Sequence, residues 1–520
     1  MRERQIQTAL ISVTDKSGLV QLASLLKEKG VKILASSGTK AHLEEEGIHA
    51  EEVSEYTGSP EILGGRVKTL HPKIHGGLLA DRDNSDHLDT LEAHGIALID
   101  LVVINLYPFV EKFRAGELSE KSFCEFIDIG GIALLRAAAK NYAHVTILTD
   151  PGQYPAAIEE IRASGGTALE TRKRLARAAF ELSSEYDATI AKFFHELSPN
   201  DEMPNRLPLS FKKAATLRYG ENPHQRAAVY ASQEDSPLLS LKQHQGKELS
   251  FNNYLDIAGA FSLARDLGKG SVAIIKHTNP CGAAWCGSPA ASYRRALECD
   301  PLSAFGGIVA VNGSVGIELA AEMTKLFLEV VLARSFDAEA MKQMSKKKNL
   351  RAVTISDRFW EEAKQSRIGV CVENALLFQE SDTGFPELDE LKTAGHREPS
   401  ASELDACKMA WKVAKHVKSN SIVIADEEGT VGIGAGQMSR VDAARIAVKK
   451  AGDAKFSLHG KVAASDAFFP FPDGVTELAQ AGIVAVIQPG GSIRDKEVIA
   501  AADAADVAMI FTGRRHFRHI

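Results

Sequence analysis

The sequence predicts an α/β protein in which a parallel-sheet domain precedes a larger region of two α/β subdomains. At 520 residues the chain is too long for one hydrophobic core. Short apolar runs of strand length alternate with helical patterns, which is typical of sheets covered by helices. Three prolines interrupt this periodicity within 197–208, so we expect a linker there and a division near residue 200.

Strand-like and helix-like segments alternate from the beginning of the N-terminal part. Ser17 is the expected N-cap of a helix that runs to Lys29, another helix is expected after the turn 36–39, and a long one over 168–196. Such βαβα alternation predicts a parallel sheet. The strands are expected at 8–13, 31–35, 100–105 and 145–148.

Beyond the linker, apolar runs again alternate with helical patterns, and the sequence has neither a fixed-period repeat nor a low-complexity tract. A region of this length predicts two subdomains. The strands are expected at 272–275, 307–311, 421–425, 461–464 and 482–487.

Composition and charge indicate an ordinary globular protein of a reducing compartment. The chain has 61 Lys and Arg against 68 Asp and Glu, a net charge of −7, which gives no electrostatic case for nucleic-acid binding. Six cysteines are too few for a disulfide framework in a chain of this length. Residues 1–5 lack the apolar core of a signal peptide, and no stretch is long enough to span a bilayer. We therefore expect a cytoplasmic protein without a membrane partner.

The strongest candidate site is the pair Lys276-His277, which follows the apolar run 271–275. Pro280 and Gly282 are expected to stop the strand, which places the pair where an α/β sheet usually presents its ligand site. A histidine can act as a base near neutral pH, and a neighbouring ammonium stabilises negative charge on a reacting oxygen. The alternative is a solvated lysine beside a hydrogen-bonded loop histidine.

Polar turns in the N-terminal part suit an anionic ligand. Ser12 and Lys16 follow the first expected strand and the turn 36–39 follows the second, so free backbone N–H groups favour a phosphate there, although simple helix caps give the same pattern. The cation-rich segment 64–77 is bracketed by glycines and predicts an anion-binding loop. A zinc site at its two histidines is disfavoured, because Pro72 and the glycines should disrupt the helix between them.

A proton-transfer site is predicted from Tyr107, Asp128 and a helix over 132–141. Tyr107 ends a buried strand before a proline, and the helix carries Arg136 and Lys140. A carboxylate, a phenol and ammonium groups can exchange protons without a metal or a nucleophilic cysteine. The alternative is a capped helix with surface charges.

Three segments of the C-terminal part carry weaker signals. The turn 217–225 offers an arginine and an aromatic ring, which suit phosphate recognition or a loop salt bridge. The glycine run 432–440 has the wrong spacing for a dinucleotide fingerprint. A zinc-deaminase site around His277 is disfavoured, because His-x-Glu is absent there and four residues separate Cys281 from Cys286.

Taken together and in order, these segments resemble the bifunctional AICAR transformylase/IMP cyclohydrolase family of purine biosynthesis over nearly the whole chain. The resemblance implies a methylglyoxal-synthase-like cyclohydrolase domain over 1–199 and, over 200–520, a transformylase domain of two cytidine-deaminase-like subdomains. It implies formyl transfer from 10-formyltetrahydrofolate to AICAR, followed by cyclisation of formyl-AICAR to IMP with loss of water. The matching segments are 13–18, 66–72, 105–109, 128–131, 135–141, 217–225, 276–282, 303–307, 432–440 and 465–471.

The resemblance also implies roles for residues in formyl transfer. His277 matches the base that takes the proton of the attacking amine, Lys276 tunes it, and Asn420 orients the reacting groups. Asp473 matches an acid at the folate site. The expected folate-side residues are Asp473, Phe468, Phe471 and Arg440, and the expected nucleotide-side residues are Arg218, Tyr219, Gly306 and Arg515.

For cyclisation a modest set of acids and bases is sufficient, because the reaction is intramolecular and the reacting groups are already adjacent. By resemblance the proton-transfer residues are Lys68, Tyr107, Asp128 and Lys140. By resemblance the nucleotide-binding residues are Ser12, Lys16, Ser36, Gly38, Thr39, Arg66 and Thr69.

The transformylase sites of the family form between subunits, so the resemblance implies a homodimer, with no catalytic metal and with a structural monovalent cation left open. The chain departs from the family pattern at Arg334-Ser335 and around Cys371, where no residue is assigned to chemistry. Two alternatives remain. A non-catalytic nucleotide sensor leaves the pair Lys276-His277 without a purpose, and a zinc hydrolase requires stoichiometric metal.

Overall fold

The computed structural model of the chain forms two compact units. The N-terminal unit comprises 1–211 with 232–234, and the C-terminal unit comprises 212–231 with 235–520. No helix in the described part of the chain is long and apolar enough to cross a bilayer. The predicted linker at 197–208 falls partly outside the described residues. The structure describes 4–60, 62–115, 117, 119, 122–197, 203–232, 236–361 and 367–519.

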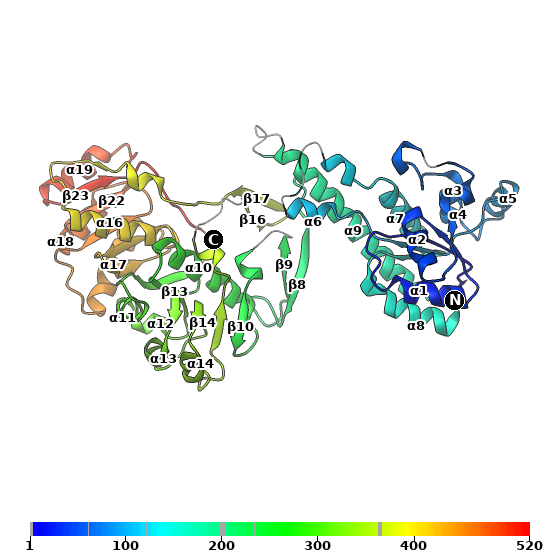
Figure 1. Cartoon of the computed structure of the whole chain (residues 1–520). Helices are drawn as coiled ribbons and strands as arrows, with labels where there is room; N and C mark the ends of the chain where they lie inside the picture. Colours follow the sequence, from blue (N-terminus) through cyan, green and yellow to red (C-terminus); the bar gives the residue numbers. More distant parts are fainter. Residues whose placement is uncertain are drawn as a thin grey trace. The chain divides into compact units, whose positions relative to one another are not determined.

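The N-terminal unit is built around a five-stranded parallel sheet of order β4-β3-β2-β5-β6, as the βαβα alternation predicts (Figure 1). Every strand predicted in this part is present. Because the strands are parallel, their carboxyl ends meet at one edge of the sheet. The strands are β2 (Thr8–Ser12), β3 (Lys32–Ala35), β4 (Glu51–Glu52), β5 (Leu101–Ile104) and β6 (Thr146–Leu148), and β1 (Arg4–Gln5) pairs separately with β7 (Gly166–Thr167).

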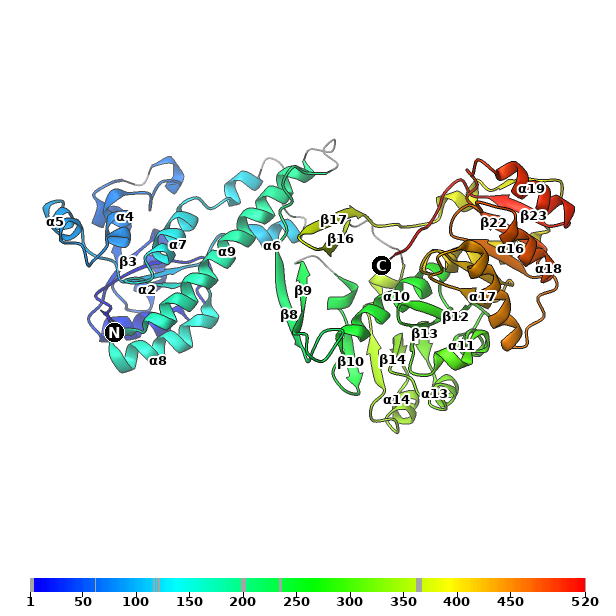
Figure 2. The ribbon, with the colours of Figure 1, turned by 180° about the vertical axis from the view of Figure 1, so that it is seen from behind.

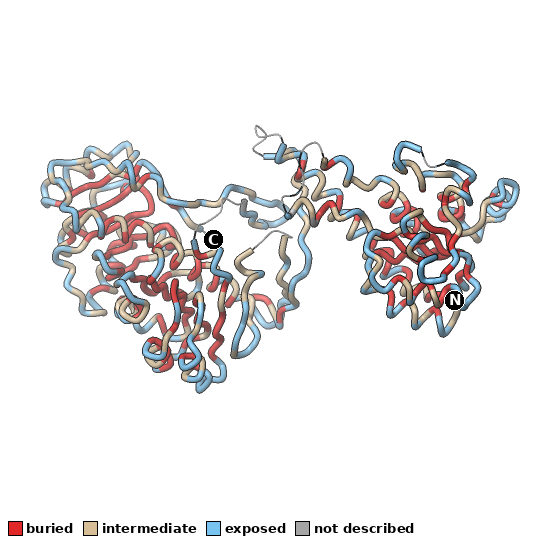
Figure 3. The backbone as a smooth tube through the Cα atoms, in the orientation of Figure 1, coloured by how far each residue is buried: buried red, intermediate tan, exposed pale blue. Residues whose placement is uncertain are grey.

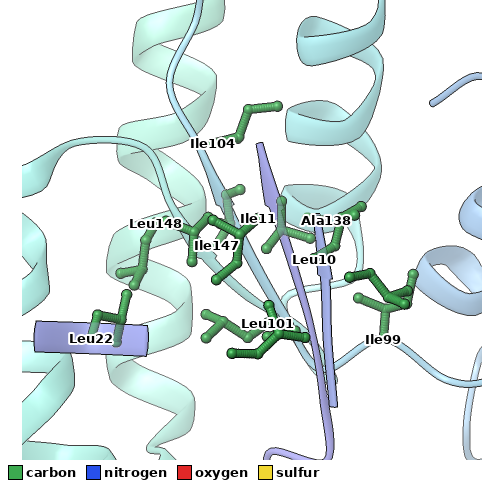
Figure 4. Packing of buried hydrophobic residues seen from close by; sticks show 14 of the residues in the cluster. Leu10, Ile11, Leu22, Ile99, Leu101, Ile104, Ala138, Ile147 and Leu148 are labelled. Atoms are coloured by element: carbon green, nitrogen blue, oxygen red, sulfur yellow. The ribbon is translucent and has the colours of Figure 1, made fainter. Parts of the chain in front are cut away.

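Helices cover both faces of this sheet. Leu10 and Ile11 are neighbours in β2 and so point to opposite faces, yet both are fully buried. Figure 4 shows them among side chains of the adjacent strands and helices, including Leu22 and Ala138. The helices are α1 (Leu19–Glu28), α2 (Ser37–Glu45), α3 (Val53–Thr57), α4 (Pro72–Leu79), α5 (Ser85–Ala93), α6 (Phe109–Arg114), α7 (Gly130–Lys140), α8 (Tyr154–Ser164) and α9 (Leu169–Glu196).

The predicted cap of the first helix is wrong. Helix α1 begins after Gly18, whose φ of 70° is left-handed and therefore suits glycine. Ser17 lies one residue earlier, and its N–H donates to Asp15 Oδ1 over 2.9 Å. The turn between β2 and α1 therefore runs from Val13 to Gly18, and Ser17 lies within it rather than at the start of the helix.

Two other helices begin earlier than predicted. Helix α2 starts at Ser37, inside the predicted turn, and α7 starts at Gly130. The predicted disruption at Pro72 is wrong, because a proline at the first helical position loses no hydrogen bond and α4 begins there. His71 is its N-cap, and its Nδ1 accepts the Lys73 N–H over 3.1 Å.

The C-terminal unit contains two six-stranded sheets with the same strand order, which we term the first half (242–354) and the second half (392–511) (Figure 2). The strands of the first half are β10 (Lys242–Gln245), β15 (Arg351–Thr354), β14 (Val330–Phe336), β13 (Ile308–Val315), β11 (Val272–Lys276) and β12 (Asn279–Ala284), in spatial order. Those of the second half are β18 (Lys392–Thr393), β23 (Ala508–Phe511), β22 (Ala485–Gln488), β21 (Val462–Ser465), β19 (Ile422–Ala425) and β20 (Thr430–Gly434).

Strand directions and connecting helices also repeat between the halves. In each half three neighbouring strands are parallel, and a hairpin, β11–β12 or β19–β20, adds antiparallel to them. The two predicted subdomains are therefore present, each with a mixed sheet, although the sequence shows no repeat. The helices are α10 (Phe251–Leu267), α11 (Pro289–Cys299), α12 (Pro301–Ala304), α13 (Ile317–Met323), α14 (Ala338–Met344), α15 (Arg358–Glu361), α16 (Ala401–Ala414), α17 (Arg440–Asp453), α18 (Asp473–Gln480) and α19 (Asp495–Ala504).

The two halves meet along β12 and β20. Ala284 forms an antiparallel bridge with Gly429, and the Ala283 N–H donates to Thr430 Oγ1 over 3.0 Å. Buried residues of α10, α16 and both sheets form one shared core, and Figure 3 colours the buried stretches of the chain red. Because β12 and β20 are antiparallel, the turn that starts β12 lies at the same end as the carboxyl end of β20. Two further hairpins lie outside these sheets, β8 (Phe211–Leu217) with β9 (Ala227–Ser232) and β16 (Arg367–Val372) with β17 (Ala375–Glu380).

Glycines in both hairpins serve helix packing rather than ligand approach. Strand β11 ends at Lys276 as predicted, but Gly282 does not end it, because Gly282 lies inside the next strand, β12. A Cβ at Gly282 would lie 2.0 Å from Ala296 O of α11, and one at Gly434 would lie 1.9 Å from Ala443 O of α17. Each helix can therefore pack directly on its hairpin only where the strand has glycine.

Candidate active sites

The first candidate site lies at the carboxyl ends of β2 and β3, where hydroxyl groups connect two turns. Ser12 Oγ donates to Ser36 Oγ over 3.1 Å, and Ser36 Oγ donates to Thr39 Oγ1 over 3.1 Å. Thr39 is buried and accepts the Val13 N–H over 3.1 Å. Gly38 is exposed in the first turn of α2, where backbone N–H groups can hold a phosphate.

Asn105 fixes the turn that follows β2. Its Oδ1 accepts the N–H and the hydroxyl of Thr14 over 2.5 and 2.8 Å, and its Nδ2 donates to Asp15 O over 2.8 Å. These bonds join the end of β5 to the segment that carries the half-buried Lys16. Lys16 is thereby held at the same edge of the sheet.

A third loop reaches this edge through Lys68 and Thr69. Lys68 Nζ donates to Ser37 Oγ over 2.7 Å, which connects the loop to the first turn of α2. A Cβ at Gly130 would lie 2.6 Å from Thr69 Oγ1, so the start of α7 contacts the same loop. The predicted anion-binding segment therefore reaches the hydroxyl-bearing turns through the part that precedes α4, and from Pro72 onward it is helical rather than a loop.

Asp128 supplies the carboxyl group of this candidate site. Its Oδ1 accepts the Gly131 N–H over 2.6 Å, and its carboxylate also accepts the Tyr107 N–H. Burial raises the pKa of Asp128 above its ordinary value, and the two hydrogen bonds oppose this only in part. Tyr107 is half exposed, and its backbone N–H is the group that contacts Asp128. A carboxyl group with a raised pKa is suited to proton transfer.

Within one chain, Lys140 does not lie close to Asp128. It ends α7 whereas Asp128 precedes the start of that helix, so the length of α7 separates them by about 15 Å. Lys140 instead lines a cavity of about 750 Å³ together with Arg136. Arg66, on the loop of Lys68, is exposed and forms an ion pair with Glu125.

The second candidate site is built on the hairpin of β11 and β12. Lys276 pairs with Asn279, which leaves His277 and Thr278 as a two-residue turn with φ angles of 52° and 61°. His277 is exposed at this tip. Lys276 Nζ donates to Phe305 O over 2.8 Å, so the ammonium lies beside the next loop of the first half.

Asn420 comes from the second half, just before β19 and after a cis peptide bond with Ser419. Its Nδ2 donates to Gln437 O over 2.9 Å and to Met438 O over 3.3 Å, and its Oδ1 accepts from Arg440 over 2.8 Å. The amide therefore connects the start of β19 to the loop after β20.

The loops of the two halves are bonded together at this point. The Lys418 N–H donates to Asn279 Oδ1 over 3.0 Å, and Asn279 closes the hairpin that carries His277. The Gly436 N–H in turn donates to Lys418 O over 2.7 Å. The structure thus places the His277 turn and the Asn420 segment in one continuous hydrogen-bonded region.

Arg440 lies beneath Asn420 and is 7% exposed. It forms a buried ion pair with Asp466 and donates to Ser465 Oγ over 2.7 Å. Its contacts within the chain therefore hold the Asn420 amide, whereas the resemblance implies a contact with folate.

The other folate-side residues lie together in sequence after β21. Phe468 and Phe471 are exposed, although large aromatic side chains are usually buried. Asp473 is exposed in the first turn of α18, and its Oδ1 accepts the Gly474 N–H over 2.7 Å. Exposed rings beside a carboxylate suit a flat, polar heterocycle.

The nucleotide-side residues lie on three separate segments. Gly306 has a φ of 74° in the loop after α12. Arg218 and Tyr219 follow β8, where the guanidinium donates to Tyr219 Oη over 2.8 Å. Arg515 is exposed in the C-terminal segment, with its guanidinium over the ring of Phe517. Both arginines are exposed on their own segments, where an anionic group can reach them.

The thiols near the hairpin are not part of a converging group of metal donors in the described part of the chain. Burial raises the pKa of Cys281 to about 12 and also raises that of Cys286, whereas a metal ligand must be a thiolate. Among the described residues, the donors that converge as a group of three are those of Asp81, Asp83 and His144.

Sequence reasoning missed three residues that hold these sites. Tyr186 Oη accepts the Asp128 N–H over 2.8 Å from 58 residues away, in the middle of α9. Asp466 pairs with Arg440, and Asp256 of α10 accepts the Thr278 N–H. Asp466 stood in a segment that had been singled out, but the other two occupy ordinary helical positions with no local signal.

Comparison with known proteins agrees with this architecture. A model of the AICARFT/IMPCHase bienzyme family matches 138–450, and a model of the MGS-like domain matches 18–133. A curated protein of Persephonella marina, named bifunctional purine biosynthesis protein PurH, is 50% identical over 98% of this chain and 99% of its own length. Proteins of the same name from Rhizobium meliloti and Halalkalibacterium halodurans are 48% and 46% identical, and each match covers 98% or more of both chains. A solved structure titled "Crystal structure of ForH" matches 36% of this chain and all of its own at 36% identity, with a TM-score of 0.33. The chain belongs to the AICARFT/IMPCHase bienzyme family.

Proposed function

We propose that the chain catalyses two consecutive steps of inosine monophosphate synthesis. The C-terminal unit transfers a formyl group from 10-formyltetrahydrofolate to AICAR, and the N-terminal unit cyclises formyl-AICAR to IMP. The observation that carries this assignment is the exposed Lys276-His277 turn, which is bonded through Asn279 to the segment of Asn420. A nucleotide sensor would need no such base at an exposed tip.

Formyl transfer requires a base because the amine of AICAR is a weak nucleophile. His277 takes the amine proton while the nitrogen attacks the formyl carbon, so that a C–N bond forms and the formyl oxygen becomes an oxyanion. The ammonium of Lys276 stabilises this charge. The bond from the formyl carbon to N10 of the folate then breaks, and tetrahydrofolate leaves after its nitrogen has taken a proton. Asn420 orients the reactants, and Asp473 acts at the folate.

Cyclisation joins the carboxamide nitrogen to the formyl carbon and expels water. Asp128 takes the proton that the carboxamide nitrogen loses on attack, and Tyr107 and Lys68 supply two protons to the oxygen that departs as water. The formamido N–H proton, which is lost in the same elimination, returns to these groups. The hydroxyl-bearing turns after β2 and β3 hold the phosphate. Little further catalysis is needed, because both reacting groups belong to one molecule.

We also assign the protein to the cytoplasm as a homodimer. All six cysteines are free, which fits a reducing compartment. A second copy is supported by the position of Lys140, which one chain leaves away from Asp128. It is also supported by the side chains of Met438 and Ile493, which are 95% and 104% exposed and would be covered by a partner.

The test is to incubate the purified, metal-stripped protein with AICAR and 10-formyltetrahydrofolate and to follow the products by mass. IMP formation supports both assignments. Formyl-AICAR that accumulates without IMP confines activity to the C-terminal unit. Binding of AICAR without turnover supports the sensor instead.

A further inference from the structure

The turn that carries His277 has an unfavourable backbone conformation for its residues. Both φ angles of the turn, 52° at His277 and 61° at Thr278, are left-handed, as a two-residue hairpin turn of this kind requires. Asn-Gly is the usual sequence there, and a β-branched residue such as threonine is a rare outlier. Such a residue is strained, and it persists only where its surroundings hold it. The surroundings of the turn must therefore supply a restraint.

The restraint is the carboxylate of Asp256, which extends from the second turn of α10. Its Oδ1 accepts the Thr278 N–H over 2.6 Å, and the carboxylate also accepts the His277 N–H. Asp256 is half-buried, and burial raises its pKa, which these two bonds and the charges of His277 and Lys418 oppose. A carboxylate that accepts two consecutive backbone N–H groups stabilises a left-handed turn directly.

We propose that Asp256 is a positioning residue for formyl transfer, which holds the two turn amides so that the imidazole of His277 stays in its productive place. This inference rests on the proposed function of His277. Asp256 itself does not touch the reacting atoms in this assignment. Its effect passes through the backbone of the turn.

The equivalent hairpin of the second half supports this role. The turn between β19 and β20 contains its own carboxylate, Asp426, whose Oδ1 accepts the N–H groups of Glu428 and Gly429 over 3.2 and 3.0 Å. In the first half the turn has only His277 and Thr278 and lacks a carboxylate of its own. Helix α10 supplies the carboxylate instead, through Asp256, so both turn positions can carry other side chains.

Loss of Asp256 should release the tip without unfolding the hairpin. Strands β11 and β12 remain paired from Val272 to Lys276, and Asn279 stays bonded to Lys418. We therefore expect Asp256→Ala to lower the kcat of formyl transfer by about 10- to 100-fold with little change in the KM for AICAR. Asp256→Asn, which retains one acceptor oxygen, should lose less.

A glycine in the turn gives a sharper test than either substitution alone. Glycine adopts the left-handed conformation without strain. Thr278→Gly in the Asp256→Ala background should therefore recover formyl transfer to within about fivefold of the wild type. Asp426→Asn, in the other hairpin, serves as the matched control and should leave formyl transfer unchanged.

Two readouts separate this inference from the proposed function. Cyclisation of supplied formyl-AICAR should stay at the wild-type rate in every variant, and hydrogen exchange of a peptide spanning 277–278 should become faster in Asp256→Ala. Unchanged exchange and unchanged kcat in Asp256→Ala would overturn the inference. Equal loss of both activities, without recovery by Thr278→Gly, would also overturn it, since that result indicates a general structural role. If the wild type transfers no formyl group, the proposed function fails, whereas the exchange measurement still tests the restraint.

Discussion

The two halves of the C-terminal unit have the same strand order but use their hairpin turns differently. In the first half the turn is two residues long and exposes His277. In the second half the turn is longer, and its Asp426 forms ion pairs with Arg295 and Lys461 over 2.9 and 2.8 Å. One hairpin therefore presents an exposed histidine, the proposed base, whereas ion pairs fix the other.

The two hairpins also differ at the ends opposite their turns, where each chain continues into a helix. The helix after β12 begins with Ser288 as its cap and Pro289, whereas the helix after β20 begins with Ser439 as its cap and the buried Arg440. That arginine holds Asn420, which faces the same end as the His277 turn. The two halves share one architecture, and their hairpins pack antiparallel to each other. The hairpin turn of one half therefore lies beside the start of a helix in the other half.

Removal of the base should have the largest effect. We expect His277→Ala to lower formyl transfer by about 10²- to 10⁴-fold, the usual contribution of a general base. Asp426→Ala, at the equivalent turn, should leave formyl transfer near the wild-type rate and lower stability instead. Steady-state assays with AICAR and 10-formyltetrahydrofolate measure the first effect, and urea denaturation measures the second. Equal losses of transfer in both variants would refute the division of roles.

Removal of the buried Arg440 should have the second largest effect. Arg440→Met leaves Asp466 charged and unpaired in a buried position, which we expect to reduce the free energy of unfolding by about 3–5 kcal/mol. Arg445→Met, on the exposed side of the same helix, should leave the unfolding midpoint nearly unchanged. Denaturant titration compares the two variants. A small effect at Arg440 would show that Asn420 has another support.

Substitution of the hairpin glycines should destabilise both halves to a similar extent. Gly282→Ala and Gly434→Ala each place a methyl group against a helix carbonyl, so we expect each to destabilise by about 1–3 kcal/mol or more. Gly452→Ala in α17 meets no atom within 4 Å and should not destabilise. Unfolding curves of the three variants make the comparison. A marked difference between Gly282 and Gly434 would mean that the helices do not pack equivalently.

The smallest effect concerns His516, which anchors the C-terminal segment to the stretch that precedes the second half. Its ring nitrogens lie 2.6 Å from Asp382 Oδ2 and 2.8 Å from Glu387 Oε1. Burial alone would lower the pKa of His516, but the two carboxylates outweigh it and raise the pKa above 6.5. Both carboxyl groups have lowered pKa values, so they remain ionised across the neutral range.

A raised pKa in the folded state means that this contact contributes fully below the unfolded value of 6.5 and is lost as the pH rises through the folded value. The difference in unfolding free energy between the wild type and His516→Gln should therefore shrink as the pH rises above 6.5. Denaturation at several pH values tests this, with the exposed His519→Gln as control. A difference that grows with pH would contradict the assignment of charge.

The sequence was most informative where local pattern decides structure. The alternation of apolar runs predicted the parallel N-terminal sheet, because the periodicity of burial depends on residues that are adjacent in the sequence. The length of the remaining chain predicted two subdomains. Helix and turn boundaries were predicted less well. Gly18 rather than Ser17 precedes α1, and Pro72 starts a helix instead of breaking one.

The restraints that hold the sites could not be predicted, because they join residues far apart in the chain. Tyr186 reaches Asp128 across 58 residues, and Lys418 reaches Asn279 across 139. The equivalence of the two hairpins was also hidden, since strand order is conserved between the halves without a sequence repeat. Residue types indicated the chemistry at His277, but only the fold shows what fixes its position.

The most direct test of the account assays His277→Ala and Asp128→Asn separately and then mixed, with AICAR and 10-formyltetrahydrofolate as substrates. The account predicts that His277→Ala makes no formyl-AICAR yet cyclises it when supplied, that Asp128→Asn accumulates it, and that the mixture makes IMP. Loss of cyclisation in a folded His277→Ala protein, or wild-type IMP formation by Asp128→Asn, would contradict the assignment of one reaction to each unit.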